Sequence, residues 1–223
     1  MSFNLTSELA RICGELTGDG HIQLKEWRGL ISFYSKNFEE IINFKSRFEN
    51  LFNLKGHIYE DKRNNCNRYK SFFISVQIAN YFVSLGVPFG NKTNQPFFVP
   101  VWVFSGDKKI KAAYLRGLFA AEGSIYGTKN KAGVRWRIEI ELWKWVKYQD
   151  CAKKFMLQLV EMLSDLGVVC SPVRFGKKNI RKDKAESIAV KFNIEKTNFR
   201  NFYKRVGFTN RLKASKLACL CGE

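Results

Sequence analysis

The sequence predicts an α+β fold built from two pseudo-symmetric repeats, each with the element order αββαββα. Three observations support this prediction: a short glycine-rich motif that occurs twice, stretches in which apolar and polar residues alternate, and amphipathic stretches with helical spacing. A chain of 223 residues is long enough for one large domain or two compact halves. We therefore expect two similar halves whose antiparallel sheets carry helices on one face and leave a polar, basic face to solvent.

The composition indicates a folded protein with a polyanionic partner. Hydrophobic residues make up 45% and aromatic residues 15% of the chain, which is far too much for a disordered basic tail. The 38 Lys and Arg residues outnumber the 20 Asp and Glu residues, and the net charge is +18. Nucleic acid is therefore the leading partner.

Nothing in the sequence indicates a membrane or secreted protein. The N-terminus lacks a basic region followed by an apolar stretch, and the most apolar run, residues 97–104, is short and contains Pro100. The six cysteines include no C-x-x-C pair, so neither a zinc site nor a secreted disulfide framework is predicted. We expect a soluble, monomeric protein of the cytoplasm with no membrane partner.

A nine-residue motif occurs at residues 12–20 (ICGELTGDG) and again at residues 115–123 (LRGLFAAEG). Each copy has an apolar residue, a glycine two positions later, small residues before an acid, and a final glycine. Capping by Thr6 or Ser7 in the first copy, and by Asp107 in the second, predicts that each motif forms the last turns of a helix.

The two motif acids, Asp19 and Glu122, would then lie at helix C-termini. The helix dipole disfavours a carboxylate there by ~0.3–1 kcal/mol, which makes the position unusual. A carboxylate beside terminal backbone carbonyls is instead a good site for a hard divalent cation. We expect Gly20 and Gly123 to provide the turns that stop the helices. Small residues four apart in each motif would let the two helices pack closely, so that both acids meet at one end.

The elements after each motif also correspond. Amphipathic helices are predicted for residues 38–54 and 149–166, which end at Gly56 and Gly167. Alternation with period two predicts half-buried antiparallel strands in residues 31–36, 134–142 and 188–194.

The two copies differ in length and are joined by a proline-rich stretch. The second copy is longer, and we expect its extra residues in polar loops at 127–133 and 176–186. Three of the 4 prolines lie between residues 85 and 107, which indicates a linker. These features predict a first repeat at residues 1–95, a linker region at 96–108 and a second repeat at 109–223.

The two motifs, in register, resemble the paired signature of the LAGLIDADG homing endonucleases, in the single-chain form with two motifs that is archaeal or intron-encoded. The resemblance covers essentially the whole chain. Residues 115–123 are the stronger match, whereas Glu15 stands where the family usually has an apolar residue. The resemblance implies a site-specific DNA endonuclease of intron homing. Such an enzyme makes a metal-dependent double-strand break at a long site, with Mg²⁺, or another divalent cation such as Mn²⁺, as cofactor.

The resemblance also implies roles for individual residues. The implied catalytic residues are Asp19, Glu122, Lys92 and Lys213. The two acids match the family's metal-binding carboxylates, and the backbone carbonyls of Gly18 and Ala121 are implied as further metal ligands. The two lysines match the lysine near the end of each repeat that lies beside the scissile phosphate.

The basic strands and hairpins are expected to bind double-stranded DNA, because a two-stranded ribbon or small curved sheet fits the major groove. Phosphate contacts would set affinity, while Arg135, Arg137 and Glu139 would read base edges. The predicted DNA-binding residues are Lys25, Arg28, Tyr34, Lys36, Lys62, Arg63, Arg68, Lys70, Lys129, Lys131, Arg135, Arg137, Glu139, Arg174, Lys177, Lys178, Arg181 and Lys182.

Two other classes of function share some of these features. A non-cleaving DNA- or RNA-binding protein of the same fold, such as an intron maturase, would keep the basic surface but would not need the metal acids. A ribosomal or other RNA-binding protein would be basic, yet it has no use for a duplicated helix-terminal carboxylate. The ends lack an initial Cys or Ser and a terminal His-Asn. We therefore expect a free-standing, intron-encoded protein rather than a complete intein.

Overall fold

Two antiparallel sheets form the framework of the computed structural model, which describes residues 4–62, 68–131, 133–181 and 184–223. In these residues the strand orders are β1-β2-β4-β3 and β5-β6-β8-β7, so the two sheets have the same topology. The first sheet consists of β1 (Gly20–Lys25), β2 (Arg28–Ser35), β3 (His57–Asp61) and β4 (Arg68–Ile74). The second consists of β5 (Gly123–Asn130), β6 (Gly133–Trp145), β7 (Arg174–Ile180) and β8 (Glu186–Ile194).

The helices follow the same order in both halves. The first half contains α1 (Ser7–Thr17), α2 (Phe38–Phe52) and α3 (Val76–Ser84), and the second contains α5 (Lys108–Glu122), α6 (Gln149–Asp165) and α7 (Phe199–Arg205). Shorter elements are η2 (Lys92–Asn94), α4 (Val101–Phe104), η3 (Val146–Tyr148) and η4 (Lys196–Asn198). The predicted α+β fold of two αββαββα repeats is confirmed, and the second repeat adds a helix, α8 (Arg211–Cys221).

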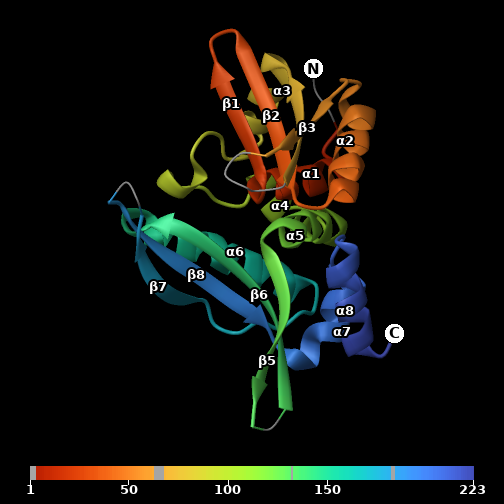
Figure 1. Cartoon of the computed structure of the whole chain (residues 1–223), viewed down its shortest axis with the longest axis vertical. Coiled ribbons are helices and arrows are strands. Elements are labelled where there is room, and N and C mark those ends of the chain that lie inside the picture. The colour runs from red at the N-terminus through yellow and green to blue at the C-terminus, as the bar shows by residue number, and fades with distance from the viewer. Residues whose placement is uncertain (1–3, 63–67, 132, 182–183) are drawn as a thin grey trace.

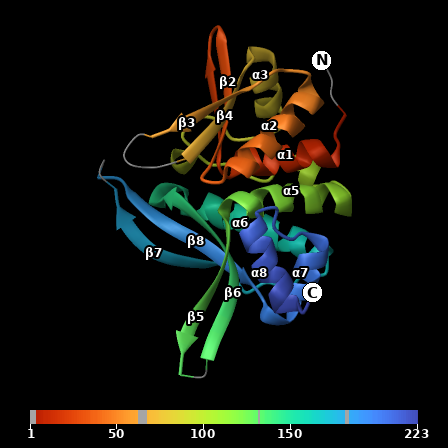
Figure 2. The same ribbon diagram turned by 45° about the vertical axis from the view of Figure 1, so that its right-hand side comes forward.

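Helices α1 and α5 lie side by side between the two sheets (Figure 2). As predicted, Thr6 caps α1 by accepting from the amide of Leu9 at 3.2 Å, and Asp107 caps α5. A Cβ on Gly14 would lie 2.1 Å from the carbonyl oxygen of Tyr114. The backbones of α1 and α5 are therefore in contact at this position, which only a residue without a side chain allows. Gly117 makes the reciprocal approach, with a Cβ position 2.2 Å from a backbone oxygen of α1. This contact brings the ends of the two motifs together.

Aromatic side chains fill the core beneath each sheet. In the first repeat the rings of Phe48 and Phe73 stack with centroids 4.0 Å apart, and both residues are fully buried. In the second repeat Phe119 of α5 packs edge-on against Phe202 of α7 at 5.0 Å. Burial of such large side chains is the main stabilising contribution in each repeat, and in the second it fixes the motif helix α5 against α7.

The hairpins β1–β2 and β5–β6 extend from the centre of the molecule in opposite directions (Figure 1). The extra residues of the second copy were expected in loops at 127–133 and 176–186, and this expectation was wrong. Residues 127–130 and 133 belong to β5 and β6, and residues 176–180 and 186 belong to β7 and β8. The added residues therefore lengthen paired strands, in which the backbone keeps its hydrogen bonds.

The two motif glycines, Gly20 and Gly123, act differently from the expected helix-stopping turn. They are the first residues of β1 and β5, and Gly123 has an extended backbone with φ −75° and ψ 142°. A Cβ on Gly20 would lie 2.4 Å from the Cα of Leu16, and a Cβ on Gly123 would lie 2.5 Å from the carbonyl oxygen of Phe119. At both positions the strand lies so close to the end of the helix that a residue larger than glycine would not fit. Neither glycine is required by a left-handed turn.

The proline-rich stretch is packed against the rest of the protein. Phe97, Val99 and Val103 are buried, and residues 101–104 form α4. The linker boundaries at 96–108 stay a prediction. Among the helices of the described residues, none combines the length and the hydropathy needed to cross a lipid bilayer. The described cysteines are free thiols, while Cys66 lies outside the described residues.

Candidate metal centre and nucleic-acid interface

The two motif acids lie at the C-terminal ends of α1 and α5, where the helices meet. Asp19 follows Gly18, the C-cap of α1, and Glu122 is the last residue of α5. A Cβ on Gly18 would lie 2.4 Å from Ala121 Cβ and 3.3 Å from Glu122 Cγ, so the two ends are in direct contact. Removal from water raises the pKa of Glu122 to about 7, and repulsion by the Asp19 carboxylate adds to the shift. Desolvation also raises the pKa of Asp19.

Each lysine of the predicted centre binds the end of its own motif helix. Lys92 Nζ donates to the carbonyl oxygens of Thr17 at 3.0 Å, Leu16 at 3.3 Å, and Gly18. Lys213 Nζ donates to the carbonyl oxygens of Ala120 at 3.0 Å and Gly123 at 2.7 Å. An ammonium at a helix C-terminus is stabilised by the partial negative charge of the last carbonyls.

At these two lysines, burial and the nearby carboxylates shift the pKa in opposite directions. Desolvation lowers the pKa of Lys92 to about 8 and also lowers the pKa of Lys213, whereas both motif carboxylates act in the opposite direction. The structure therefore brings Asp19, Glu122, Lys92 and Lys213 into one electrostatically coupled cluster, together with Gly18 and Ala121.

The donor set of this cluster fits a hard divalent cation. It offers two carboxylates and the helix-terminal carbonyl of Gly18, which already attracts the ammonium of Lys92. Mg²⁺ prefers oxygen ligands and is usually held by one or two carboxylates with water and phosphate oxygens completing its shell. The described residues contain no group of three or more His, Cys, Asp and Glu side chains placed to hold a metal ion. A metal here would thus rely on the two acids, backbone carbonyls, water and a phosphate.

A cleft of about 420 Å³ opens beside Asp19. Its lining residues are Asp19, Tyr34, Ser35, Lys36, Asn37, Glu40, Arg68, Ala120, Ala121, Asn210 and Lys213. Sequence reasoning missed Glu40 and Asn210, whose side chains are joined by a hydrogen bond of 2.8 Å from Asn210 Nδ2 to Glu40 Oε1. Asn210 could have been found as the cap of α8, since its Oδ1 accepts from the amide of Lys213 at 3.0 Å. No local pattern marks Glu40, which lies in the first turn of α2.

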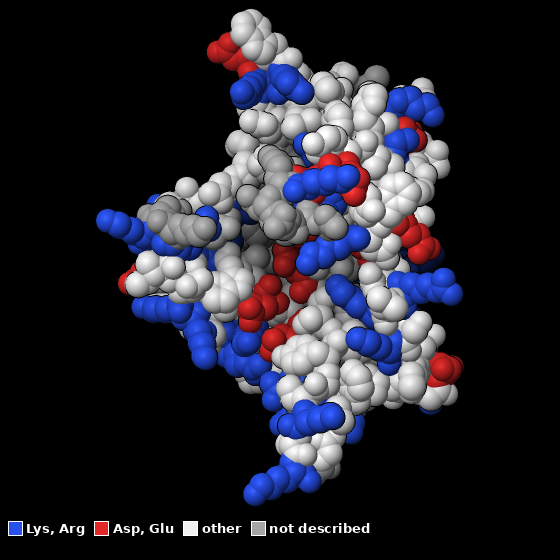
Figure 3. Space-filling model, in the orientation of Figure 1, with Lys and Arg blue, Asp and Glu red and all other residues white. Residues whose placement is uncertain are grey.

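Acidic side chains gather near the centre of the face shown in Figure 3, and Lys and Arg side chains lie mainly around them. Of the predicted DNA-binding residues, the exposed ones are Lys25, Arg28, Lys36, Lys62, Lys129, Lys131, Arg135, Arg174, Lys177 and Lys178. The half-buried ones are Tyr34, Arg68, Lys70, Arg137 and Arg181. Arg63 and Lys182 lie outside the described residues.

Three predicted DNA-binding residues of the first sheet form one cluster. The guanidinium of Arg68 lies 5.0 Å and Lys70 Nζ lies 5.6 Å from the centroid of the Tyr34 ring. Arg68 also donates to the buried carboxylate of Asp61 at 3.0 Å. The cations are therefore held in place on the surface of the sheet, with Arg68 partly committed to an internal ion pair.

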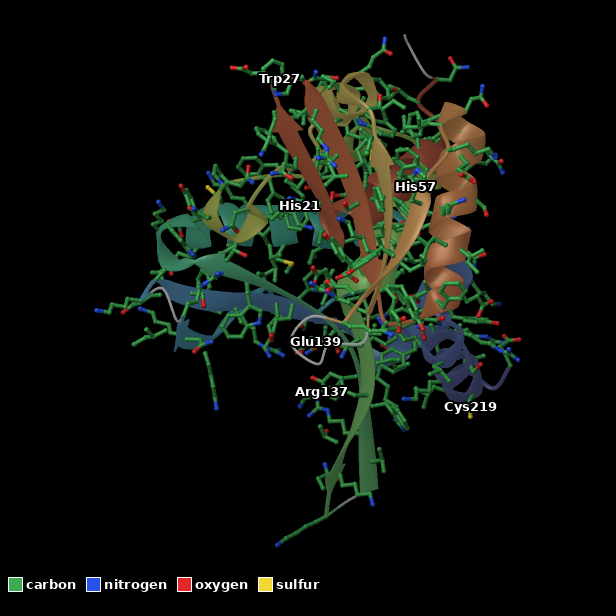
Figure 4. The ribbon with its side chains drawn as sticks, turned by 45° about the horizontal axis from the view of Figure 1, so that its top comes forward. His21, Trp27, His57, Arg137, Glu139 and Cys219 are labelled. Atoms are coloured by element: carbon green, nitrogen blue, oxygen red, sulfur yellow. The ribbon has the colours of Figure 1, made fainter. Side chains whose placement is uncertain are left out.

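Glu139 differs from the exposed base-reading residue that its strand alternation predicts. Its side chain is buried, Tyr126 Oη donates to Oε1 at 3.1 Å, and Arg174 Nη2 donates to Oε2 at 3.1 Å. Lys191 Nζ lies 3.5 Å from the same carboxylate. Figure 4 shows Arg137 and Glu139 on the same strand, β6. Glu139 thus orders its basic neighbours, while Arg135 in the same row is exposed and Arg137 is half-buried.

The exposed tip of the first hairpin carries a residue that the charge analysis passed over. Trp27 is 85% exposed between β1 and β2, next to Arg28 and near Lys25, and it stands at the far end of the hairpin in Figure 4. The tip also carries the acid Glu26, so Trp27 stands between one acid and one cation. An exposed aromatic ring with cations nearby can stack on a nucleic-acid base.

Comparisons with known proteins agree with this fold. Residues 109–207 match the family model of the LAGLIDADG-like domain. The chain is 26% identical over 212 residues to the tRNA-splicing ligase RtcB of Pyrococcus furiosus, a match that covers 90% of this chain and 21% of the ligase. It is 25% identical over 218 residues to glutamine–fructose-6-phosphate aminotransferase of Methanocaldococcus jannaschii, covering 98% of this chain and 18% of that protein. The chain spans about a fifth of the length of these curated relatives.

Solved structures share the fold across nearly the whole chain. A variant of the homing endonuclease I-DmoI, in complex with its nicked target DNA in the presence of Mn, has a TM-score of 0.58 and 17% identity, covering 91% of this chain and 96% of that one. A second I-DmoI variant with target DNA in the presence of Mg has a TM-score of 0.54 and 15% identity, covering 90% and 98%. Full-length DUF199/WhiA from Thermatoga maritima has a TM-score of 0.54 and 14% identity, covering 100% and 62%.

The duplicated motif, the matching sheets and these likenesses lead to one conclusion. Residues 109–207 match the LAGLIDADG-like domain, and the chain as a whole has the two-repeat, single-chain fold of the LAGLIDADG homing endonucleases.

Proposed function

We propose that this protein is a site-specific, metal-dependent DNA endonuclease that makes a double-strand break at a long recognition site. The observation that carries the proposal is the cluster at the meeting point of α1 and α5. Two carboxylates, Asp19 and Glu122, share it with two lysines, Lys92 and Lys213, between two basic sheets. We further propose that it acts inside the cell as a monomer, since each chain holds both halves of the centre.

In this proposal the acids, the lysines and the basic side chains of the sheets have different roles in phosphodiester hydrolysis. Asp19 and Glu122 would hold Mg²⁺, or another divalent cation such as Mn²⁺, which when bound supplies activation of water and stabilisation of the leaving 3′ oxygen. Lys92 and Lys213 would place positive charge beside the phosphate and offset the negative charge that develops in the transition state. The basic side chains of the two sheets would hold the DNA across this centre.

The nature of the relatives supports an independent activity for this segment. The matched regions are only 21% of a tRNA-splicing ligase and 18% of an aminotransferase, two enzymes with unrelated chemistry. The occurrence of a similar segment in two enzymes with unrelated chemistry favours a mobile element with a function of its own. Cleavage of an uninterrupted target site, as in homing, is such a function.

The decisive experiment incubates the protein with DNA that contains its uninterrupted insertion site. In Mg²⁺ we expect a double-strand break within the site, and in Ca²⁺ or with a chelator we expect binding without cleavage. The matched control is the same DNA with the site scrambled. Tight, site-specific binding without cleavage in both Mg²⁺ and Mn²⁺ would instead establish the non-cleaving DNA-binding protein of the same fold, and preference for intron RNA would establish a maturase.

A further inference from the structure

A buried lysine in β6 interrupts an otherwise apolar row of side chains. Residues two apart in a strand share one face, and Ile138, Ile140 and Leu142 line the face that packs on the core. Lys144 continues this row and is only 1% exposed. A charged group in such a place requires hydrogen-bond partners, because removing an ammonium from water is costly.

The partners of Lys144 lie in the other half of the protein, on the segment that carries Lys92. Lys144 Nζ donates to the carbonyl oxygen of Gln95 at 2.7 Å and to that of Lys92. It also lies 3.7 Å from the centroid of the Phe97 ring, a favourable cation–π distance. Burial and the nearby ammonium of Lys92 lower the pKa of Lys144 to about 7. No carboxylate within the described residues forms a salt bridge with Lys144.

These contacts form a continuous connection from β6 to the motif helix of the first repeat. Lys144 holds the backbone of η2 on both sides, at residues 92 and 95, and the side chain of Lys92 then reaches the C-terminal carbonyls of α1. The segment has little regular structure of its own, since η2 is a single turn of three residues. Contacts with other segments therefore set its position, among them the hydrogen bonds from Lys144 to its carbonyls and the one from Gly90 N to the carbonyl of Ile22.

The second lysine of the centre is held in another way. Lys213 lies in the first turn of α8, where its amide donates to the Asn210 side chain, and the helix itself fixes its backbone. Lys92 lies only in the three-residue turn η2. The backbone of this turn is held by Lys144, which comes from the opposite repeat. The two halves of the centre are thus supported differently.

We propose that Lys144 is a positioning residue of the nuclease centre, which holds η2 in place so that the Lys92 ammonium stays at the end of α1. The proposal rests on the proposed nuclease function for its effect on rate, but the placement of Lys92 can be measured separately. It adds to the centre a residue of the second repeat that acts through Lys92 and is not one of the proposed metal ligands.

The first test measures Lys92 without requiring cleavage. Lysines of the folded wild-type protein and of Lys144→Met are acetylated with an N-hydroxysuccinimide ester, and the rate at each site is followed by mass spectrometry. We expect faster labelling of Lys92 in Lys144→Met and unchanged labelling of Lys213. The control is Lys147→Met, an exposed lysine three residues along, which should leave both rates unchanged. Equal labelling of Lys92 in wild type and Lys144→Met overturns the proposal.

The second test measures coupling through cleavage rates. Misplacement of a catalytic group by about 1 Å can cost 10²-fold in rate, so we expect Lys144→Met to slow cleavage by about tenfold or more. Because Lys144 acts through Lys92, adding Lys144→Met to Lys92→Met should slow cleavage no further, whereas adding it to Lys213→Met should multiply the two effects. Multiplication in both backgrounds, or no effect of Lys144→Met alone, contradicts the proposal.

A third variant separates positioning from simple loss of stability. Lys144→Gln keeps a side-chain amide that can donate hydrogen bonds, and it should restore part of the protection of Lys92 and part of the rate. If Lys144→Gln and Lys144→Met behave alike at equal melting temperature, the hydrogen bonds to η2 do not matter and the proposal fails. If wild-type protein does not cleave at all, the proposed function fails, while the labelling of Lys92 still decides the role of Lys144.

Discussion

At the scale of single residues, the centre depends on two carboxylates kept in an unfavourable place. Asp19 and Glu122 stand at helix C-termini, share a partly desolvated site and repel each other, and only nearby cations compensate. We predict that Asp19→Asn or Glu122→Gln slows double-strand cleavage by roughly 10²-fold or more, because a neutral amide is a poor ligand for a hard cation. Plasmid cleavage in Mg²⁺ measures this effect.

Binding should respond in the opposite direction. Each substitution removes a negative charge from a surface that faces a polyanion, so affinity for target DNA in Ca²⁺ should be unchanged or tighter in gel-shift titrations. The matched control is Glu161→Gln, an exposed acid on α6 far along the chain from the motifs, which should alter neither property. Normal cleavage by either motif variant would remove that acid from the metal site.

At the scale of elements, the contact between α1 and α5 decides whether a centre exists. Gly14 and Gly117 are the two points at which a Cβ would overlap the backbone of the opposite helix. We predict that Gly14→Ala or Gly117→Ala lowers the free energy of unfolding by ~1–3 kcal/mol, because the overlapping atoms are backbone and cannot rotate away. Urea denaturation measures the loss, and cleavage should fall with it. Gly18→Leu should also be destabilising, because its Cβ would lie 2.4 Å from Ala121 Cβ, a side-chain atom that no rotation of a side-chain torsion can move.

The control for this prediction is Asn50→Ala on the exposed side of α2, which should change stability by less than about 0.5 kcal/mol. An alanine in mid-helix normally gains about 0.5–1 kcal/mol over glycine, so a stabilised Gly14→Ala variant would show that the helices separate easily.

At the scale of the whole molecule, the two long hairpins point away from the centre in opposite directions (Figure 1). We predict that replacing Lys25 and Arg28 by Gln weakens protection at one end of the DNA site, and that replacing Lys129 and Arg135 weakens protection at the other end. Each lost phosphate contact should make the slope of log K against log[salt] shallower by roughly 0.9. DNase footprinting and salt titration measure the two effects.

The choice of these residues follows from the structure. Arg68, which the sequence also predicts to bind DNA, pairs with the buried carboxylate of Asp61, so its removal would disturb folding as well as binding. Retreat of both footprints from the same end, or unchanged salt slopes, would contradict the arrangement of two arms along the DNA.

Much of the architecture follows from short-range patterns. Helix caps at Thr6 and Asp107, period-two strands and the twofold motif are all visible within a few residues, because local backbone geometry sets those periods. Both sheets and the pairing of α1 with α5 could therefore be predicted. The centre composed of Asp19, Glu122, Lys92 and Lys213 could be predicted for a related reason, because each repeat contains one motif acid and one lysine at corresponding positions.

Other features depend on contacts between segments that are far apart in the chain. Glu40 reaches the cleft only because α2 packs beside the motif helices and α8 brings Asn210 to it. Lys144 stands where alternation predicts an apolar residue, and only the fold reveals that η2 supplies its partners. Glu139 is buried rather than presented to DNA because Arg174 from β7 and Tyr126 from β5 enclose it. Periodicity assigns a side chain to a face, but whether that side chain is free or bound is set by the neighbours that tertiary packing provides.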